Sequence, residues 1–432
     1  MKYFSTNKQS TVADFREATM RGQAPDKGLY FPESIPRASA SFLDNLDRLS
    51  RAEIAYQVIR PYVGNSIPDA ELQRIAAETV DFEFPLVPVT KEIFSLELFH
   101  GPTLAFKDVG ARFMSRCLSY FSKERSGKVT VLVATSGDTG GAVASGFYQV
   151  DGVEVVILYP SGKVSAVQEK QLTTLGGNIR ALEVDGSFDD CQRMVKQAFG
   201  DAELNNKLFL TSANSINVAR WLPQQFYYFY AWQQWQWKDN PPVISVPSGN
   251  FGNICAGIVA YRTGLPVKHF IAACNANDVV PAYFRDGKYQ PQPARPTISN
   301  AMDVGDPSNF IRMLELFDHR FGAIKEMVSS YSISDEETRR TMLDVKKETG
   351  YQTDPHGAVA YTALRRYLAN SDAHLKGIFL ETAHPIKFFD VVEPVTGEKV
   401  PMPESIKQIM DKPKVSTMIS SDYNELREFL VK

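Results

Sequence analysis

Residues 128–160 read KVTVLVATSGDTGGAVASGFYQVDGVEVVILYP. Two β-branched runs, at 129–134 and 153–160, flank a segment of small residues with helical character. Two strands separated by a helix are the pattern of a parallel pair joined by a crossover connection. Both runs are almost continuously apolar, which is typical of strands that are covered on both faces. This stretch therefore predicts an α/β fold with a parallel sheet.

The same alternation continues towards the C-terminus. Further apolar, β-branched runs are IRALEVD, LFLTS, VISVP, HFIAAC and GIFLE, and helical segments such as FDDCQRMVKQAF and NICAGIVAYRTG separate them. The first ninety residues differ, because amphipathic stretches such as DFREATMRG and DAELQRIAAETV are broken there by prolines. They predict a helical N-terminal unit. The aromatic segment 226–237, FYYFYAWQQWQW, predicts a half-buried helix.

Composition excludes several classes of protein. The chain has 432 residues, enough for two or three packed units, and its net charge of -3 disfavours nucleic-acid binding. The N-terminus has no apolar signal core, and no long uncharged apolar run occurs, so we expect no membrane span and a cytoplasmic protein. The four cysteines, Cys117, Cys191, Cys255 and Cys274, form no CxxC pair. They predict reduced core residues and no metal site.

Two glycine-rich loops follow strands and lead into helices, TSGDTGG at 135–141 and PSGNFGN at 247–253. Glycines let the backbone approach a ligand, and the free N–H groups at a helix start attract phosphate or carboxylate. Each loop is therefore a candidate anion site. A tight turn without a ligand is the alternative, and the residues alone leave both open.

A third loop, SANSINVARW at 212–221, places Asn214, Ser215 and Asn217 just after a strand and Arg220 one helical turn beyond them. Amides, a hydroxyl and a guanidinium in one short segment suit a phosphate or carboxylate. A helix cap followed by an exposed arginine is the ordinary alternative.

Lys107 lies within an otherwise apolar run, ELFHGPTLAFKDVGARFM at 97–114. Burial lowers the pKa of an ammonium group and frees its amine as a nucleophile. The alternative is a lysine that is paired with Asp108 or with another carboxylate.

In their joint order, these segments resemble the threonine synthase family, in its longer bacterial and fungal branch. The matching segments are HGPTLAFKD, ATSGDTGGAV, SANSINVAR, PSGNFGN and ETAHPIKF, and others such as GLYFPESIP and TDPHGAVAY extend the match over nearly the whole chain. The resemblance implies the tryptophan-synthase-β-like fold of pyridoxal-phosphate enzymes (fold type II), with two parallel-sheet α/β domains. It implies a helical N-terminal unit (1–90), a large cofactor-binding domain (91–127 and 235–432) and a small inserted domain (128–234).

The resemblance also implies a cofactor, pyridoxal 5'-phosphate, and a role for each matching residue. Lys107 would carry the cofactor and then move protons. The cofactor phosphate would be held by Gly249, Asn250, Phe251, Gly252 and Asn253, and the pyridine nitrogen by Thr382. The substrate carboxylate would be received by Ser136, Gly137, Asp138 and Thr139, and its phosphate by Asn214, Ser215 and Arg220. Asn253 departs from the family, which often has aspartate at this position.

The implied reaction converts O-phospho-L-homoserine and water to L-threonine and phosphate, by γ-elimination and then β-addition, in a monomer or homodimer. Two alternatives stay open: a dehydratase or phospholyase of the same fold, and a non-catalytic protein that binds a phosphorylated ligand. We expect His100, His356 and His384 to be structural, with His384 the exception to consider because it lies two residues after Thr382.

Overall fold

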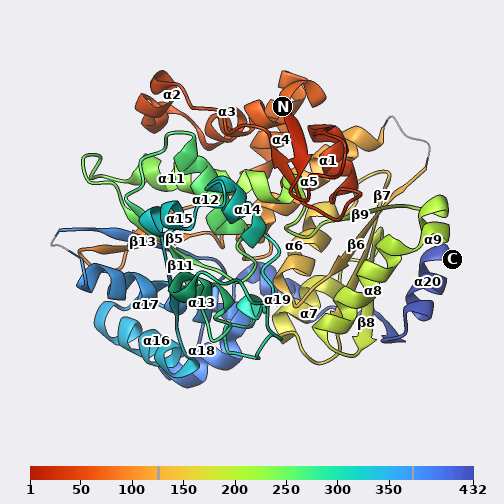
Figure 1. Cartoon of the computed structure of the whole chain (residues 1–432). Helices are drawn as coiled ribbons and strands as arrows, with labels where there is room; N and C mark the ends of the chain where they lie inside the picture. Colours follow the sequence, from red (N-terminus) through yellow and green to blue (C-terminus); the bar gives the residue numbers. More distant parts are fainter. Residues whose placement is uncertain (124–126, 372–373) are drawn as a thin grey trace.

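The computed structural model describes residues 1–123, 127–371 and 374–432. Residues 124–126, at the predicted end of the first part of the large domain, lie outside this range. In Figure 1 the chain forms a left part and a right part, each built on a sheet, with the N-terminal segment above them.

The sheet of the right part is parallel throughout the described residues, in the order β14-β8-β7-β6-β9. Its strands are β6 (Val129–Ala134), β7 (Val153–Pro160), β8 (Ile179–Asp185), β9 (Phe209–Ser212) and β14 (Thr417–Ser420). Its helices are α6 (Asp138–Phe147), α7 (Ala166–Thr173), α8 (Phe188–Gly200), α9 (Ala202–Lys207) and α20 (Tyr423–Val431). Every residue of β6 is buried, as its continuous apolar run predicts. The crossover pattern predicted for 128–160 is confirmed.

One strand of this sheet comes from the C-terminus. The sequence assigned all of 235–432 to the large domain, whereas β14 pairs with β8, and α20 packs on α8. Ile419 of β14 lies in the same apolar cluster as Leu182 and Leu426. β14 is short and mostly exposed, so no apolar run marked it as a strand.

The sheet of the left part has the order β12-β11-β10-β13-β5-β4, and only the edge pair β4–β5 is antiparallel among its described pairs. Its strands are β4 (Leu86–Pro88), β5 (Ile93–Glu97), β10 (Val243–Pro247), β11 (His269–Cys274), β12 (Val328–Ser332) and β13 (Gly377–Glu381). The helices outside the right part and the N-terminal segment are α5 (Lys107–Ser122), α10 (Val218–Trp221), α11 (Phe226–Gln234), α12 (Gly252–Arg262), α13 (Val279–Asp286), α14 (Phe310–Leu316), α15 (Phe321–Met327), α16 (Asp335–Thr349), α17 (Pro355–Ala369), α18 (Phe389–Thr396) and α19 (Glu404–Met410).

The N-terminal segment combines the predicted helices with a small antiparallel sheet. Its helices are α1 (Phe15–Arg21), α2 (Ala40–Asp44), α3 (Arg51–Val63) and α4 (Asp69–Thr79), and its strands are β1 (Lys2–Ser5), β2 (Ala13–Asp14) and β3 (Tyr30–Pro32). Short 3-10 turns connect elements across the chain: η1 (Leu46–Arg48), η2 (Gly64–Ser66), η3 (Leu222–Gln225), η4 (Asn300–Met302) and η5 (Pro385–Phe388). The three short strands were not predicted, because none of them has a run of alternating residues.

The aromatic segment forms α11, but the predicted half-burial is wrong. Residues 226–232 are all buried inside this chain, between α3, η1 and α12. Its rings pack on Phe42, Phe84 and Phe270. The polar atoms of the helix are satisfied internally, since Tyr228 donates to the carbonyl and side-chain oxygens of Asn253.

The two sheets bring four candidate segments to one place. The loops after β6, β9, β10 and β13 all follow the carboxyl ends of parallel strands, where open α/β sheets bind ligands. Helices α6 and α12 begin directly after two of these loops, so their N-termini supply free N–H groups there.

Replacement of Gly257 by alanine should destabilise the protein. A Cβ atom at Gly257 would lie 2.4 Å from the ring of Tyr228, which is buried and bonded to Asn253. We expect a loss of about 1–3 kcal/mol in the free energy of unfolding from overpacking, larger than the gain in helix propensity, measured by urea denaturation. Gly322→Ala is the control, because open space surrounds that glycine. Equal stability of the two variants would contradict this packing.

Candidate active site

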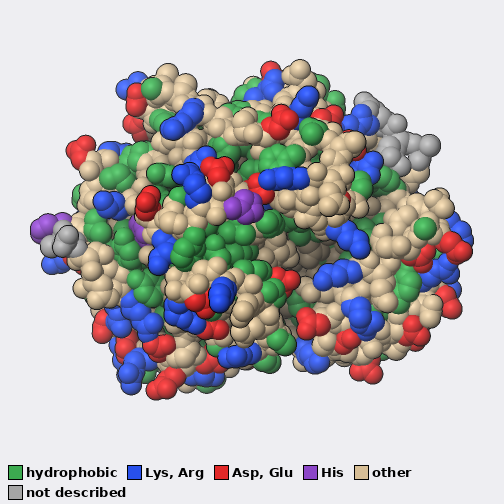
Figure 2. All heavy atoms as spheres, in the orientation of Figure 1, with side chains coloured by type: hydrophobic (Ala, Val, Ile, Leu, Met, Phe, Trp, Pro, Cys, Tyr) green, Lys and Arg blue, Asp and Glu red, His purple; other side chains and the backbone are tan. Residues whose placement is uncertain are grey.

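A single cleft of about 1880 Å³ holds the predicted site residues. Figure 2 shows the surface hollowed between the left and right parts. The predicted residues that line it are Lys107, Ser136, Asp138, Thr139, Asn214, Ser215, Arg220, Gly249, Asn250, Phe251, Gly252, Asn253 and Thr382. Of the predicted residues, Gly137 does not line the cleft. A Cβ atom at this position would collide with the side chain of Gln168.

Lys107 is the first residue of α5, and its segment is tied to the end of β13. The N–H of Phe106 donates to the carbonyl of Thr382 at 2.9 Å, and Ala105 forms a bridge with Ala383. Two residues that are distant in the sequence, Lys107 and Thr382, therefore lie on adjoining backbone segments. A group bound at Thr382 could be reached by the amine.

The carboxylates near Lys107 have other partners. Asp108 accepts hydrogen bonds from the N–H and hydroxyl of Thr103. Asp138 forms an ion pair with Lys387. Within the described ranges no carboxylate forms an ion pair with Lys107, so the predicted alternative of a Lys107–Asp108 pair is wrong.

Burial lowers the pKa of the Lys107 ammonium to about 8. The carboxylate of Asp138 opposes this shift, whereas the charges of Lys387 and Arg220 add to it. A fraction of the amine is therefore uncharged near neutral pH. An uncharged amine can attack a carbonyl carbon or accept a proton.

The loop 247–253 has the geometry of an anion cradle. Phe251 has a left-handed backbone with φ 62°, a conformation that costs free energy in a bulky residue and that recurs at ligand sites. It turns the chain directly into the N-terminus of α12. At Gly249 a Cβ atom would lie 2.7 Å from the backbone of Met302, so only glycine fits. Asn250 holds the loop instead of facing outward, because its side chain accepts from the N–H of Ser308 at 2.8 Å.

Asn253, at the start of α12, has a side-chain donor without a partner among the described residues. Its side-chain oxygen accepts from Tyr228 at 2.9 Å, and its Nδ2 is buried with no hydrogen-bond partner among the described residues. An unsatisfied amide donor in the cleft suits a phosphate oxygen, which an aspartate would repel.

The side chain of Thr135 holds the loop 135–141 in place, because its hydroxyl oxygen accepts hydrogen bonds from the N–H groups of Gly137 and Gly140. Ser136 and Thr139 line the cleft. Gln168 packs against Gly137 and donates to Asp138 at 2.9 Å. Asp138 is the first residue of α6, so the N-terminus of this helix also faces the cleft.

The segment 212–221 contributes a buried guanidinium group, that of Arg220, to the lining of the cleft. Arg220 donates to the carbonyl of Ala213, its Nε has no partner in the described part of the chain, and no described carboxylate pairs with it. Burial lowers its pKa to about 10, so it stays charged at neutral pH. The predicted alternative of an exposed arginine is wrong. A buried, unpaired cation in a cleft suits an anionic ligand.

Two of the other polar residues of this segment line the cleft, and one is a structural helix cap. Asn214 and Ser215 line the cleft, and Ser215 accepts from Asn309 at 3.0 Å. Asn217 is a buried helix cap that also donates to Thr19, so it is structural.

Sequence reasoning missed two buried cations. Arg312 is fully buried and donates to the carbonyls of Ser215 and Ile216, so it supports the segment 212–221 from behind. Lys387 is also fully buried and contacts Asp138. Lys387 lies in the matching segment ETAHPIKF, but neither cation has neighbours in the sequence that indicate its burial or its partners.

The three histidines of the matching segments have structural hydrogen-bond partners, as expected. The one that lines the cleft differs from the one that the sequence suggested. His100 pairs with Glu97 at the surface, and His384 accepts from the N–H of Ile386, with burial lowering its pKa to about 4. His356, not His384, lines the cleft. Its two ring nitrogens bond Asp354 and the N–H of Ala301, which fixes the ring.

Comparisons with known proteins agree with this geometry. The family description "Pyridoxal-phosphate dependent enzyme" matches residues 86–377, "Threonine synthase N terminus" matches 2–80, and "Threonine synthase, C-terminal" matches 357–430. The threonine synthase of Serratia marcescens is 44% identical over 100% of this chain and 99% of its own. The chain belongs to the threonine synthase family.

Solved structures of this family share the fold. The crystal structure of threonine synthase from Escherichia coli is 43% identical and covers 100% of this chain and 99% of its own, with a TM-score of 0.93. A pyridoxal-phosphate-bound threonine synthase from Brucella melitensis is 35% identical, covers 100% and 98%, and has a TM-score of 0.94. The predicted fold type and the predicted cofactor, pyridoxal 5'-phosphate, are confirmed.

Two further observations concern the classes considered at the outset. No helix in the described ranges is long and apolar enough to cross a membrane. The four cysteines are free and buried, and the described residues contain no cluster that could hold a metal ion.

The amine of Lys107 should titrate well below an ordinary lysine, which titrates near ~10.4. Because its pKa lies at about 8 in the folded protein, the amine should be mostly charged below pH 8 and mostly neutral above it. Competitive acetylation of the apoenzyme across pH 6–11, read by mass spectrometry, checks this with the surface lysines as internal references. A Lys107 that reacts in parallel with those references would contradict it.

Proposed function

We propose that the protein converts O-phospho-L-homoserine and water to L-threonine and phosphate, with Lys107 as the residue that carries the cofactor. The observation that supports this best is the presence of two separate anion sites in one cleft. The loop 247–253 at the start of α12 is one, and Arg220 with Asn214 is the other. A cofactor phosphate and a substrate phosphate require these two sites in addition to the loop 135–141, which is left for the substrate carboxylate. A dehydratase acting on an unphosphorylated amino acid requires only a cofactor site and a carboxylate site, so the site at Arg220 favours a phosphorylated substrate.

The residues of the first site suit the cofactor. Gly249, Asn250, Phe251, Gly252 and Asn253 would hold its phosphate through backbone N–H groups and the free amide of Asn253. Thr382 would bond the ring nitrogen. A neutral hydroxyl there does not enforce protonation of the ring, unlike a carboxylate.

The residues of the second site suit the substrate. Arg220, Asn214 and Ser215 would take its phosphate, and Ser136, Thr139 and the N-terminus of α6 its carboxylate. Gly137 contributes by leaving room for Gln168, and Asp138 by anchoring the loop. The substrate would thus be held at both ends, with its reacting carbons between them.

Lys107 would then supply the proton transfers. The cofactor, when bound, stabilises negative charge that develops next to the amino group of the substrate. Once the substrate amine has displaced it from the cofactor, the neutral amine of Lys107 would take the proton from Cα, pass it to the bound cofactor, and then take one from Cβ. The bond between Cγ and the phosphate oxygen would break. Arg220 balances the charge of the departing phosphate. Water adds its hydroxyl to Cβ, and protons return to Cγ and Cα.

We also propose a cytoplasmic setting and a monomer or homodimer. Four free, buried cysteines suit a reducing compartment.

Product analysis tests the reaction. We expect the purified holoenzyme to release threonine and phosphate in equal amounts from O-phospho-L-homoserine. Lys107→Ala should lose turnover and the visible absorption of the bound cofactor, while Lys407→Ala on the exposed face of α19 should retain both. Phosphate released together with a 2-oxo acid would identify a phospholyase instead. A coloured, active Lys107→Ala variant would exclude Lys107 as the cofactor residue.

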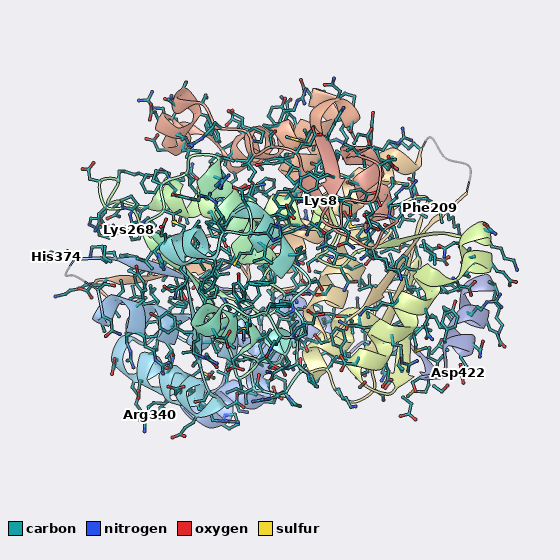
Figure 3. The ribbon with its side chains drawn as sticks, in the orientation of Figure 1. Lys8, Phe209, Lys268, Arg340, His374 and Asp422 are labelled. Atoms are coloured by element: carbon teal, nitrogen blue, oxygen red, sulfur yellow. The ribbon has the colours of Figure 1, made fainter. Side chains whose placement is uncertain are left out.

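Replacement of Arg220 tests the second anion site. We expect Arg220→Ala to raise KM for the phosphorylated substrate by about 10- to 100-fold, because a charged hydrogen bond of about 1.5–3 kcal/mol is lost. Cofactor absorption should stay unchanged. The control is Arg340→Ala on α16, which Figure 3 labels at the lower left, far from the cleft. If KM stayed unchanged, Arg220 would not be a substrate ligand.

A further inference from the structure

A buried ammonium group joins three segments of the site. Lys387 of η5 is fully buried, and its Nζ lies 2.8 Å from Oδ1 of Asp138. The same Nζ donates to the carbonyl of Thr103 at 2.9 Å. Thr103 belongs to the turn before Lys107, and Asp138 begins α6. Lys387 therefore links the turn before the cofactor lysine to the loop after β6.

Asp138 is the carboxylate that both lysines share. Burial alone would raise the pKa of Asp138, but the charges of Lys387 and Lys107 outweigh burial and hold the pKa well below its usual range. Asp138 is thus ionised at neutral pH. Within the described part of the chain, Lys387 forms an ion pair with Asp138, whereas Lys107 does not.

We propose that Lys387 is a positioning residue for the reaction: its ammonium group holds the Asp138 carboxylate and so keeps that carboxylate from pairing with the Lys107 amine. This inference rests on the proposed role of Lys107. A buried carboxylate without a bonded cation is strongly unfavourable. If Lys387 were absent, Lys107 would be the nearest remaining ammonium group with which Asp138 interacts.

The consequence for Lys107 follows from the sign of the charges. An anion near an amine favours its protonated form, and a cation near it favours the neutral form. With Lys387 in place, the negative charge of Asp138 is largely balanced and the amine of Lys107 can lose its proton. Without Lys387, the charge of Asp138 would hold the proton on Lys107, and the amine would be a poorer nucleophile and base.

The remaining charged groups around the pair do not replace Lys387. Asp108, on α5, is held by Thr103. Arg220 also disfavours the charged form of Lys107, but it has no ion pair with Asp138 among the described residues. His384 is neutral at ordinary pH because burial lowers its pKa to about 4.

The pair also accounts for an acidic residue in a loop that is proposed to receive an anion. The carboxylate of Asp138 is bonded to Lys387 and to Gln168, so its charge is balanced within the protein. The loop keeps an anchor, and the N-terminus of α6 stays available to a carboxylate.

The test measures Lys107 directly in the apoenzyme, by competitive acetylation and mass spectrometry across pH 6–11. For Lys387→Met we expect the half-reaction pH of Lys107 to rise by about one unit or more above that of the native protein, a roughly tenfold loss of reactivity at pH 7. Lys407→Met, on exposed α19, is the matched control and should not move it. Circular dichroism establishes that each variant is folded.

Two further variants separate this role from a structural one. In Asp138→Asn/Lys387→Met the carboxylate is gone as well, so the half-reaction pH should fall back towards the native value. Asp138→Asn alone, with Lys387 intact, should lower it below the native value, which keeps the test available if Lys387→Met does not fold. An unchanged Lys107 titration in folded Lys387→Met, or in Asp138→Asn, would overturn the proposal.

The measurement does not depend on turnover. If Lys107→Ala proved active, the proposed function would fail while the acetylation results still reported the electrostatic link. If the titrations stayed unchanged and threonine was still formed, the link alone would fail.

Discussion

The site depends on making the amine of one lysine partly uncharged near neutral pH, in a cleft that attracts anions. Cations such as Arg220 attract anionic ligands and also lower the pKa of Lys107. The need to bind anions and the need for an uncharged amine are therefore compatible. The conflict comes from Asp138, a buried carboxylate that favours a charged Lys107. Lys387 relieves it by bonding Asp138 at 2.8 Å. Burial, which is the first cause of the lowered pKa of Lys107, then outweighs the remaining effect of the Asp138 charge.

The fold supplies this arrangement through strand ends and helix starts. The loops after β6, β9, β10 and β13 meet in one cleft, and the N-termini of α6 and α12 open into it. The hydrogen bond from Phe106 to Thr382 places the start of α5 beside the end of β13. Lys107, Arg220 and Thr382 thereby line the same cleft, although each belongs to a different supersecondary unit.

The parts of this arrangement that local sequence encodes could be predicted. Continuous apolar runs identified β6, β7, β10 and β13, and glycine-rich loops after strands identified the lining of the cleft. Burial of Arg220 was not predictable locally, because a helix cap followed by an arginine is usually exposed. Lys387 was missed because its partners are tertiary: Thr103 lies 284 residues earlier in the chain. β14 was missed because a short edge strand with exposed residues has no apolar run.

The most direct test of the account is a crystal structure of the holoenzyme with a non-hydrolysable phosphonate analogue of O-phospho-L-homoserine. The account predicts the cofactor phosphate at the loop 247–253 and the phosphonate at Arg220 and Asn214, with Lys387 still bonded to Asp138. A phosphonate bound elsewhere, with Arg220 out of contact, would contradict the two-site reading of the cleft and the substrate assigned to it.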